Sequence, residues 1–169
     1  MTRPDIVVSR WIALKGTLDL YRDNEEKLCK SLPSFILRRV AKFGELMAGP
    51  GEAGLFSDRI FLAGEMGKGG VYGALWELGE RSGTGLFADL KEIPIRQETI
   101  EIANILDTDP YMLDSKGAFL FLAESGFELV RLFKEKGINA AVIGRITDDN
   151  DRVIVNGERR RYLTPPLSS

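Results

Sequence analysis

The chain has 169 residues, of which 44% are hydrophobic and 28% charged, so its composition suits one globular domain and excludes disordered, collagen-like and disulfide-rich classes. Its 23 basic and 25 acidic side chains give a net charge of −2, which provides no general attraction to nucleic acid or to an anionic membrane. The absence of histidine excludes a Ser-His-Asp triad and any histidine-ligated zinc site.

The first third of the chain indicates one strand and two helices. Residues 5–14 are rich in β-branched and aromatic side chains, which favours a strand. Apolar residues at helical spacing predict helices over 19–32 and 36–47, and we expect the two to pack as a helical pair. The single cysteine, Cys29, lies among charged residues of the first helix, and we interpret it as an unreactive thiol.

The remaining two thirds alternate strands with helices. Strands are expected over 59–63, 86–90, 117–123, 140–147 and 153–162, the last folded into a hairpin at Asn156-Gly157, and helices over 71–81, from 96 to 106 and from 126 to 137. The 126–137 helix has the clearest start, because Ser125 and Glu128 fit a capping box. Such an order predicts a layered α/β or α+β domain with a mixed sheet.

A glycine-rich turn over residues 64–70, Gly-Glu-Met-Gly-Lys-Gly-Gly, lies between an expected strand and an expected helix. Free amides at a helix N-terminus beside Lys68 could bind an anion such as phosphate. The turn is not a Walker loop, because Gly69 stands where that loop has serine or threonine. The alternative is purely structural: the glycines permit a tight turn and close packing of helix on sheet.

Other polar clusters favour structural roles. Asp107, Asp109 and Asp114, and the acidic stretch 148–151, are interpreted as polar turns rather than metal ligands. Three arginines at 159–161 suggest protection of an edge strand rather than a nucleic-acid patch. No apolar run approaches the roughly 18 residues of a membrane span, and the first ten residues do not form a signal peptide, so we expect a cytoplasmic location without membrane partners.

Four segments carry a resemblance to a known family: residues 69–77, 93–102, 109–113 and 140–146. In this order they resemble the C-terminal domain of the aminoimidazole ribonucleotide (AIR) synthase-related superfamily. That superfamily includes AIR synthase, the hydrogenase maturation dehydratase, selenophosphate synthetase and thiamine-monophosphate kinase, and the hydrogenase-maturation-like branch looks most similar.

The resemblance implies an α+β fold, a three-layer α/β/α unit with a mixed sheet and partial ferredoxin-like topology. It also implies two parts of the chain: residues 1–16 would hold the closing strand of a missing N-terminal domain, and residues 17–169 the C-terminal-like domain. In such enzymes ATP and Mg are held mainly by the N-terminal domain, and the C-terminal domain forms the other wall of the cleft.

On this resemblance, the phosphate or substrate cleft is lined by two turns. Its expected residues are Gly64, Glu65, Gly67, Lys68, Gly69, Gly70, Ser115, Lys116 and Gly117. The first turn departs from the His-Asp-Val-Thr-Glu-Gly-Gly-like segment of relatives, which removes a histidine, a hydroxyl and one acidic charge and adds the Lys68 cation. The ending 165–169 lacks the terminal cysteine that the hydrogenase dehydratase modifies, so we do not expect that chemistry here.

The sequence therefore predicts the C-terminal domain of an ATP-dependent enzyme that is inactive without its N-terminal domain. The alternative is a stand-alone, non-catalytic binding or assembly module of the same fold. The expected partners are the N-terminal domain, a small-molecule substrate of unidentified structure and, as the family suggests, a second copy in a homodimer. No residue is identified as catalytic or as a metal ligand.

Overall fold

The structure, a computed structural model, describes residues 3–166. Residues 1–2 of the expected N-terminal part and residues 167–169 of the ending that lacks the terminal cysteine lie outside the described residues. The strands are β1 (Asp5–Ser9), β2 (Ile60–Glu65), β3 (Gly85–Asp89), β4 (Phe119–Ala123), β5 (Ala140–Thr147), β6 (Arg152–Asn156) and β7 (Arg159–Tyr162). The α-helices are α1 (Leu14–Asp23), α2 (Glu25–Ser31), α3 (Ser34–Ala41), α4 (Gly70–Ser82), α5 (Gln97–Ile105) and α6 (Gly126–Glu135).

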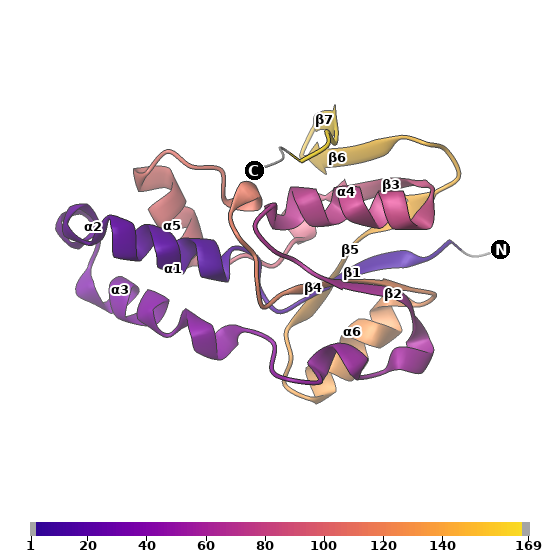
Figure 1. The fold of residues 1–169 in the computed structure, drawn as a ribbon, viewed down its shortest axis with the longest axis horizontal. Coiled ribbons are helices and arrows are strands. Elements are labelled where there is room, and N and C mark those ends of the chain that lie inside the picture. Colours follow the sequence, from indigo (N-terminus) through magenta and orange to yellow (C-terminus); the bar gives the residue numbers. More distant parts are fainter. Residues whose placement is uncertain (1–2, 167–169) are drawn as a thin grey trace.

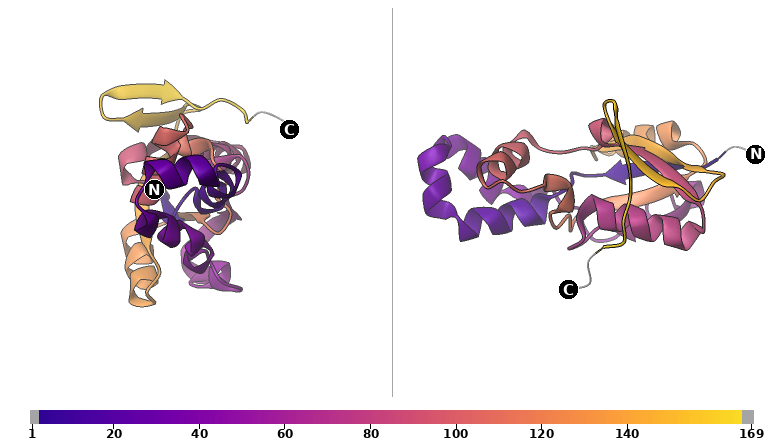
Figure 2. Two further views of the ribbon diagram at one scale, coloured as in Figure 1. Left: turned by 90° about the vertical axis from the view of Figure 1, so that its left-hand side faces the viewer. Right: turned by 90° about the horizontal axis from the view of Figure 1, so that it is seen from above.

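All seven strands form one sheet in the order β2-β4-β1-β5-β3-β6-β7. The β3–β6 pair is parallel and every other neighbouring pair is antiparallel. The sheet is therefore mixed. The predicted hairpin is confirmed and forms one edge of the sheet (Figure 2). Its turn residues are Gly157, with a φ of 67°, and Glu158, whereas Asn156 is the last residue of β6 and pairs with Arg159.

Apolar side chains on the two faces of the sheet enter two separate cores. On β4, Leu120 and Leu122 join the core that includes Leu75 of α4, whereas Phe121 joins the core that includes Phe133 of α6. The sheet thus lies between α4 and α6, as Figure 1 shows. The expected α+β fold with three α/β/α layers is confirmed, and β4 is covered on both faces as its apolar run predicts.

A third core lies beside one end of the sheet, where α1, α2, α3 and α5 meet (Figure 1). Leu14, Leu28, Val40 and Ile102, one from each helix, are buried there. The helix expected over 19–32 is split into α1 and α2. Asn24 causes the break, because its side-chain amide donates a 3.0 Å hydrogen bond to the Leu20 carbonyl oxygen.

The strand expected over residues 5–14 is shorter in the structure. β1 ends at Ser9 because Arg10 and Ala13 adopt left-handed backbone conformations, with φ of 69° and 64°. Long-range contacts hold both residues. The Arg10 guanidinium pairs with Glu52 at 2.5 Å, and the Ala13 amide donates to a distant serine hydroxyl, that of Ser115, at 2.8 Å.

β1 also lies between β4 and β5, in the middle of the sheet. It pairs with both neighbours along its full length, from Asp5 to Ser9, and Ile6, Val7 and Val8 have no exposed surface. A division at residue 16 would remove this central strand and cut α1. The structure therefore makes residues 5–16 an integral part of the domain.

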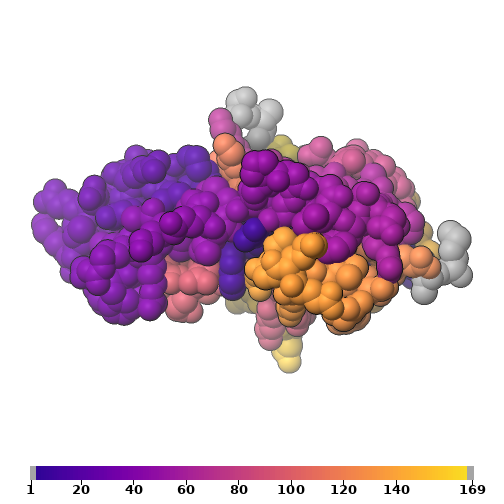
Figure 3. All heavy atoms as spheres, turned by 90° about the horizontal axis from the view of Figure 1, so that it is seen from below, coloured from indigo at the N-terminus to yellow at the C-terminus, as the bar shows by residue number. Residues whose placement is uncertain are grey.

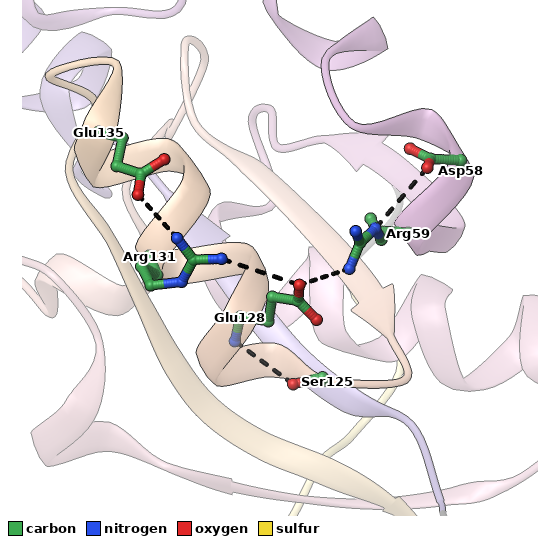
Figure 4. A network of polar contacts seen from close by, with 6 residues as sticks. All are labelled: Asp58, Arg59, Ser125, Glu128, Arg131 and Glu135. Carbon is green, nitrogen blue, oxygen red and sulfur yellow. Dashed lines mark hydrogen bonds and ion pairs between the residues drawn. The ribbon is translucent and has the colours of Figure 1, made fainter.

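The start of α6 follows the sequence prediction in one respect and differs in another. The Glu128 amide donates to the Ser125 hydroxyl at 3.4 Å, and Gly137 beyond the helix has a φ of 75°. The Glu128 carboxylate does not reach back to complete the capping box. It pairs instead with Arg59 at 2.5 Å and approaches Arg131 at 3.8 Å, which ties α6 to the segment before β2 (Figure 4).

The molecular surface seen from below also shows α6, in orange, beside the purple segment that leads into β2 (Figure 3).

Within residues 3–166, no helix has both the length and the apolar character needed to cross a membrane.

Candidate functional site

Two turns, the paired glycine turns, span residues 64–70 and 115–117 and lie side by side. The first leads from the end of β2 into α4, and the second precedes β4. The Ser115 amide donates to the Gly67 carbonyl oxygen at 3.0 Å, and the Gly117 amide donates to Glu65 Oε2 at 3.1 Å. The structure thus brings together the two segments that the sequence analysis assigns to one cleft.

The exposed part of the first turn offers free hydrogen-bond donors. Among residues 3–166, the backbone amides of Gly67, Lys68 and Gly69 have no acceptor, and all three residues are exposed. Gly69 is αR, with a φ of −75°, and Gly70 follows with a φ of 68°. In anion-binding concavities such a succession aligns the amides of the two residues and the next one, here Gly69, Gly70 and Val71. The Gly70 amide donates to the Gly67 carbonyl oxygen at 3.0 Å and Val71 is buried, so the exposed Gly69 amide is the free donor at the positive end of the α4 dipole.

Two cations stand at the paired glycine turns. Lys68 and Lys116 are exposed, and within the described part of the chain neither ammonium group forms an ion pair. The arrangement can therefore bind an anion through backbone amides and a mobile ammonium group, the combination suited to a phosphate oxygen.

Close packing explains two of the glycines. A Cβ atom on Gly70 would lie 2.5 Å from the Tyr111 carbonyl oxygen, and one on Gly117, whose φ is 94°, would lie 2.4 Å from Cγ of Met47. Tyr111 and Met47 therefore shape the turns, although the sequence analysis did not include them. Both come from distant segments, so no local pattern could have identified them.

Two of the expected site residues support the turns from inside. Ser115 is fully buried, and its hydroxyl accepts from the Ala13 amide and donates to the Leu113 carbonyl oxygen at 3.0 Å. Gly64 lies within β2 and is half-buried. These residues hold the turns in place, and the exposed residues of the two turns are Glu65, Gly67, Lys68, Gly69 and Lys116.

The acidic clusters serve as turn caps. Asp109 accepts from the Tyr111 amide at 2.9 Å, and Asp114 accepts from the Lys116 amide at 3.0 Å. The Thr147 hydroxyl donates to Asp149 at 2.7 Å, which together with the Asp151 amide lowers the pKa of the Asp149 carboxyl below 3.8. Nowhere in residues 3–166 do three Asp, Glu or Cys side chains converge in a manner that could hold a metal ion.

Curated relatives share sequence with this domain. The chain is 32% identical over 105 residues to phosphoribosylformylglycinamidine synthase subunit PurL of Caldanaerobacter subterraneus subsp. tengcongensis, which covers 60% of this chain and 14% of PurL. It is 27% identical over 105 residues to the same subunit of Staphylococcus carnosus, again covering 14% of that protein. The chain therefore spans a small part of these relatives.

Solved structures share the fold. E. coli HypE, a hydrogenase maturation protein, superposes with a TM-score of 0.76 and 16% identity over all of this chain and 52% of HypE. HypE in complex with ATP gives a TM-score of 0.72 with 16% identity over 100% of this chain and 52% of that one. Thiamine monophosphate kinase from Aquifex aeolicus gives 0.64 with 15% identity, covering 95% of this chain and 52% of the kinase.

Residues 46–156 match the family model described as AIR synthase related protein, C-terminal domain. The match covers more than half of the chain and includes both paired glycine turns. The chain therefore belongs to the AIR synthase-related family and corresponds to its C-terminal domain.

Proposed function

We propose that this domain forms one wall of the nucleotide and substrate cleft of an ATP-dependent AIR synthase-related enzyme acting in the cytoplasm, and that it is inactive without an N-terminal domain. The observation that carries the proposal is the exposed surface of the paired glycine turns, where three backbone amides (Gly67, Lys68 and Gly69) and two lysines (Lys68 and Lys116) have no partner within residues 3–166. The relatives are longer than this chain, and one HypE structure holds ATP.

In this proposal the domain's own residues bind and orient phosphate. The amides of Gly67 to Gly69 donate to phosphate oxygens, and the Lys68 ammonium balances their charge. Glu65 fixes the second turn against the first through the Gly117 amide. When bound, ATP supplies the phosphoryl group that activates an oxygen of the substrate. The family resemblance assigns the acidic residues that would hold Mg to the N-terminal domain.

The proposal is tested by ATP hydrolysis. The isolated chain with Mg-ATP should show no turnover above background, and activity should appear only in a protein that also contains the N-terminal domain. Hydrolysis by the isolated chain at ordinary enzyme rates would contradict the proposal.

A variant tests the role of Lys68. In the two-domain protein, Lys68→Gln should raise the KM for ATP about tenfold, because a charge-assisted hydrogen bond of about 1.5 kcal/mol is lost. Lys27→Gln is the matched control, since Lys27 is an exposed lysine on α2 without an ion pair in the described residues. Equal KM values for the two variants would remove Lys68 from the site.

The second candidate is a stand-alone binding or assembly module, in which the same turns bind an anionic partner without catalysis. It is favoured by the departure of the first turn from the pattern of relatives, which removes a histidine, a hydroxyl and one acidic charge and adds the Lys68 cation. The intact mass of the protein in its native cells separates the two. A mass of about 35 kDa supports the enzyme, and a mass near 18.8 kDa supports the module. Light scattering of the same sample would test the expected homodimer.

A further inference from the structure

A hollow of about 360 Å³ opens between the β6–β7 hairpin, α4 and the short 3-10 helix over Pro110–Met112. It is separate from the paired glycine turns, because no residue of those turns lines it. The hollow is lined by Tyr72, Leu90, Asp109, Tyr111, Ile154, Val155, Asn156, Arg159, Arg160 and Arg161.

Charge in the hollow is strongly one-sided. Three arginines of β7 line it together with one acidic residue, Asp109, whose carboxylate already accepts the Tyr111 amide. Arg161 lies over the Tyr72 ring at 4.7 Å from its centroid. Within residues 3–166, Arg159 and Arg161 form no ion pair, so both remain available to an anion.

The strand register explains why these groups converge. Ile154 pairs with Arg161, and Asn156 pairs with Arg159, so these four side chains share one face of the hairpin. Ile154 is buried in the same core as α4. The hairpin face that carries Arg159 and Arg161 is therefore the face turned toward α4, and Arg160, which pairs with Val155, projects from the opposite face.

Two tyrosines form an aromatic surface in the hollow. The rings of Tyr72 and Tyr111 stack with centroids 5.9 Å apart and an interplanar angle of 27°. Burial, with the nearby Asp109 charge, raises the pKa of Tyr72 to about 12 and also raises the pKa of Tyr111, so both hydroxyls keep their protons at neutral pH. The Tyr72 hydroxyl accepts a hydrogen bond from Arg161, which leaves its own hydrogen free to be donated.

We propose that this hollow is a binding site for a small phosphate monoester with an aromatic or other planar group. Arg159 and Arg161 hold the phosphate, the Tyr72 hydroxyl donates to it, and the organic group packs on Tyr111 and Leu90. Protection of a sheet edge needs only exposed charge, and it does not account for an arginine directed onto a half-buried tyrosine beside a hollow. The site is independent of the function proposed for the paired glycine turns.

The test follows backbone amide shifts of the full 169-residue chain during titration with phenyl phosphate, inorganic phosphate and phenol. Phenyl phosphate should shift amides of 154–161 and bind more tightly than inorganic phosphate, and phenol should bind least. Shifts confined to 67–71, or equal affinity for the two phosphates, would overturn the proposal. Shifts confined to 67–71 would still support the role of the glycine turns.

Variants assign the contact. Arg159→Gln should weaken phenyl phosphate binding about tenfold, because a guanidinium–phosphate contact is lost from an exposed strand that contributes little to folding. Arg22→Gln is the control, since Arg22 is an exposed arginine of α1, in the helical cluster away from the hairpin (Figure 1). Unchanged affinity in Arg159→Gln would overturn the assignment, as would an equal loss in the control.

Discussion

Replacement of Gly70 by alanine should destabilise the protein through two separable effects. Gly70 has a φ of 68°, a left-handed conformation that costs an alanine about 1 kcal/mol. The added Cβ would also lie 2.5 Å from the Tyr111 carbonyl oxygen and 2.8 Å from the carbonyl carbon of Met112. Both contacts are with backbone, which cannot rotate away, so overpacking adds about 1 to 3 kcal/mol. We expect a loss of about 2 to 4 kcal/mol in the free energy of unfolding.

Gly83 provides a matched control on the same helix. It caps the C-terminus of α4 with the same φ of 68°, but nothing lies within 4 Å of its Cβ position. Gly83→Ala should therefore cost only about 1 kcal/mol, the backbone contribution. Urea denaturation followed by circular dichroism measures both variants. Equal losses would refute the packing of the first glycine turn against Tyr111.

Two further outcomes follow from buried groups. Ser115→Ala should lower the free energy of unfolding by about 1 to 3 kcal/mol in urea denaturation, because the buried Ala13 amide loses its acceptor. The control Ser31→Ala, at an exposed hydroxyl, should change that free energy by less than about 0.5 kcal/mol. A similar loss in both variants would contradict the role of the Ser115 hydroxyl. Because folding raises the pKa of Tyr72 from 10.0 to about 12, its contribution to stability is complete below pH 10 and is lost as the pH rises toward 12. Wild type should therefore lose more stability than Tyr72→Phe over that interval, and parallel losses would contradict the shift.

Local signals located most elements after residue 59. The helix that follows Ser125 and the β6–β7 hairpin at Gly157 depend on residues adjacent in sequence, and both elements form. The side chain of Glu128 and the place of Asn156 in the hairpin differ from the local pattern. The β1–α1 junction could not be predicted in this way. Arg10 and Ala13 adopt positive φ without being glycine, and the contacts that hold them come from Glu52 and Ser115, far along the chain.

The candidate site likewise combines features that the local sequence predicts with features that depend on distant residues. The 64–70 turn was found from its glycines, and its association with residues 115–117 came from the family resemblance. The exposure of Lys68 and the burial of the Ser115 hydroxyl depend on how β2 and β4 pair, with Glu65 opposite Phe119. The hollow beside Arg159 could not be predicted, because its tyrosines belong to α4 and to the segment before β4.

Titration of the isolated chain with inorganic phosphate, followed by backbone amide NMR, tests the central claim most directly. The account predicts progressive, saturable shifts of the amides at residues 67–71, larger in wild type than in Lys68→Gln. If those amides do not move at any phosphate concentration, the paired glycine turns are structural only, and the proposed wall of the cleft is contradicted.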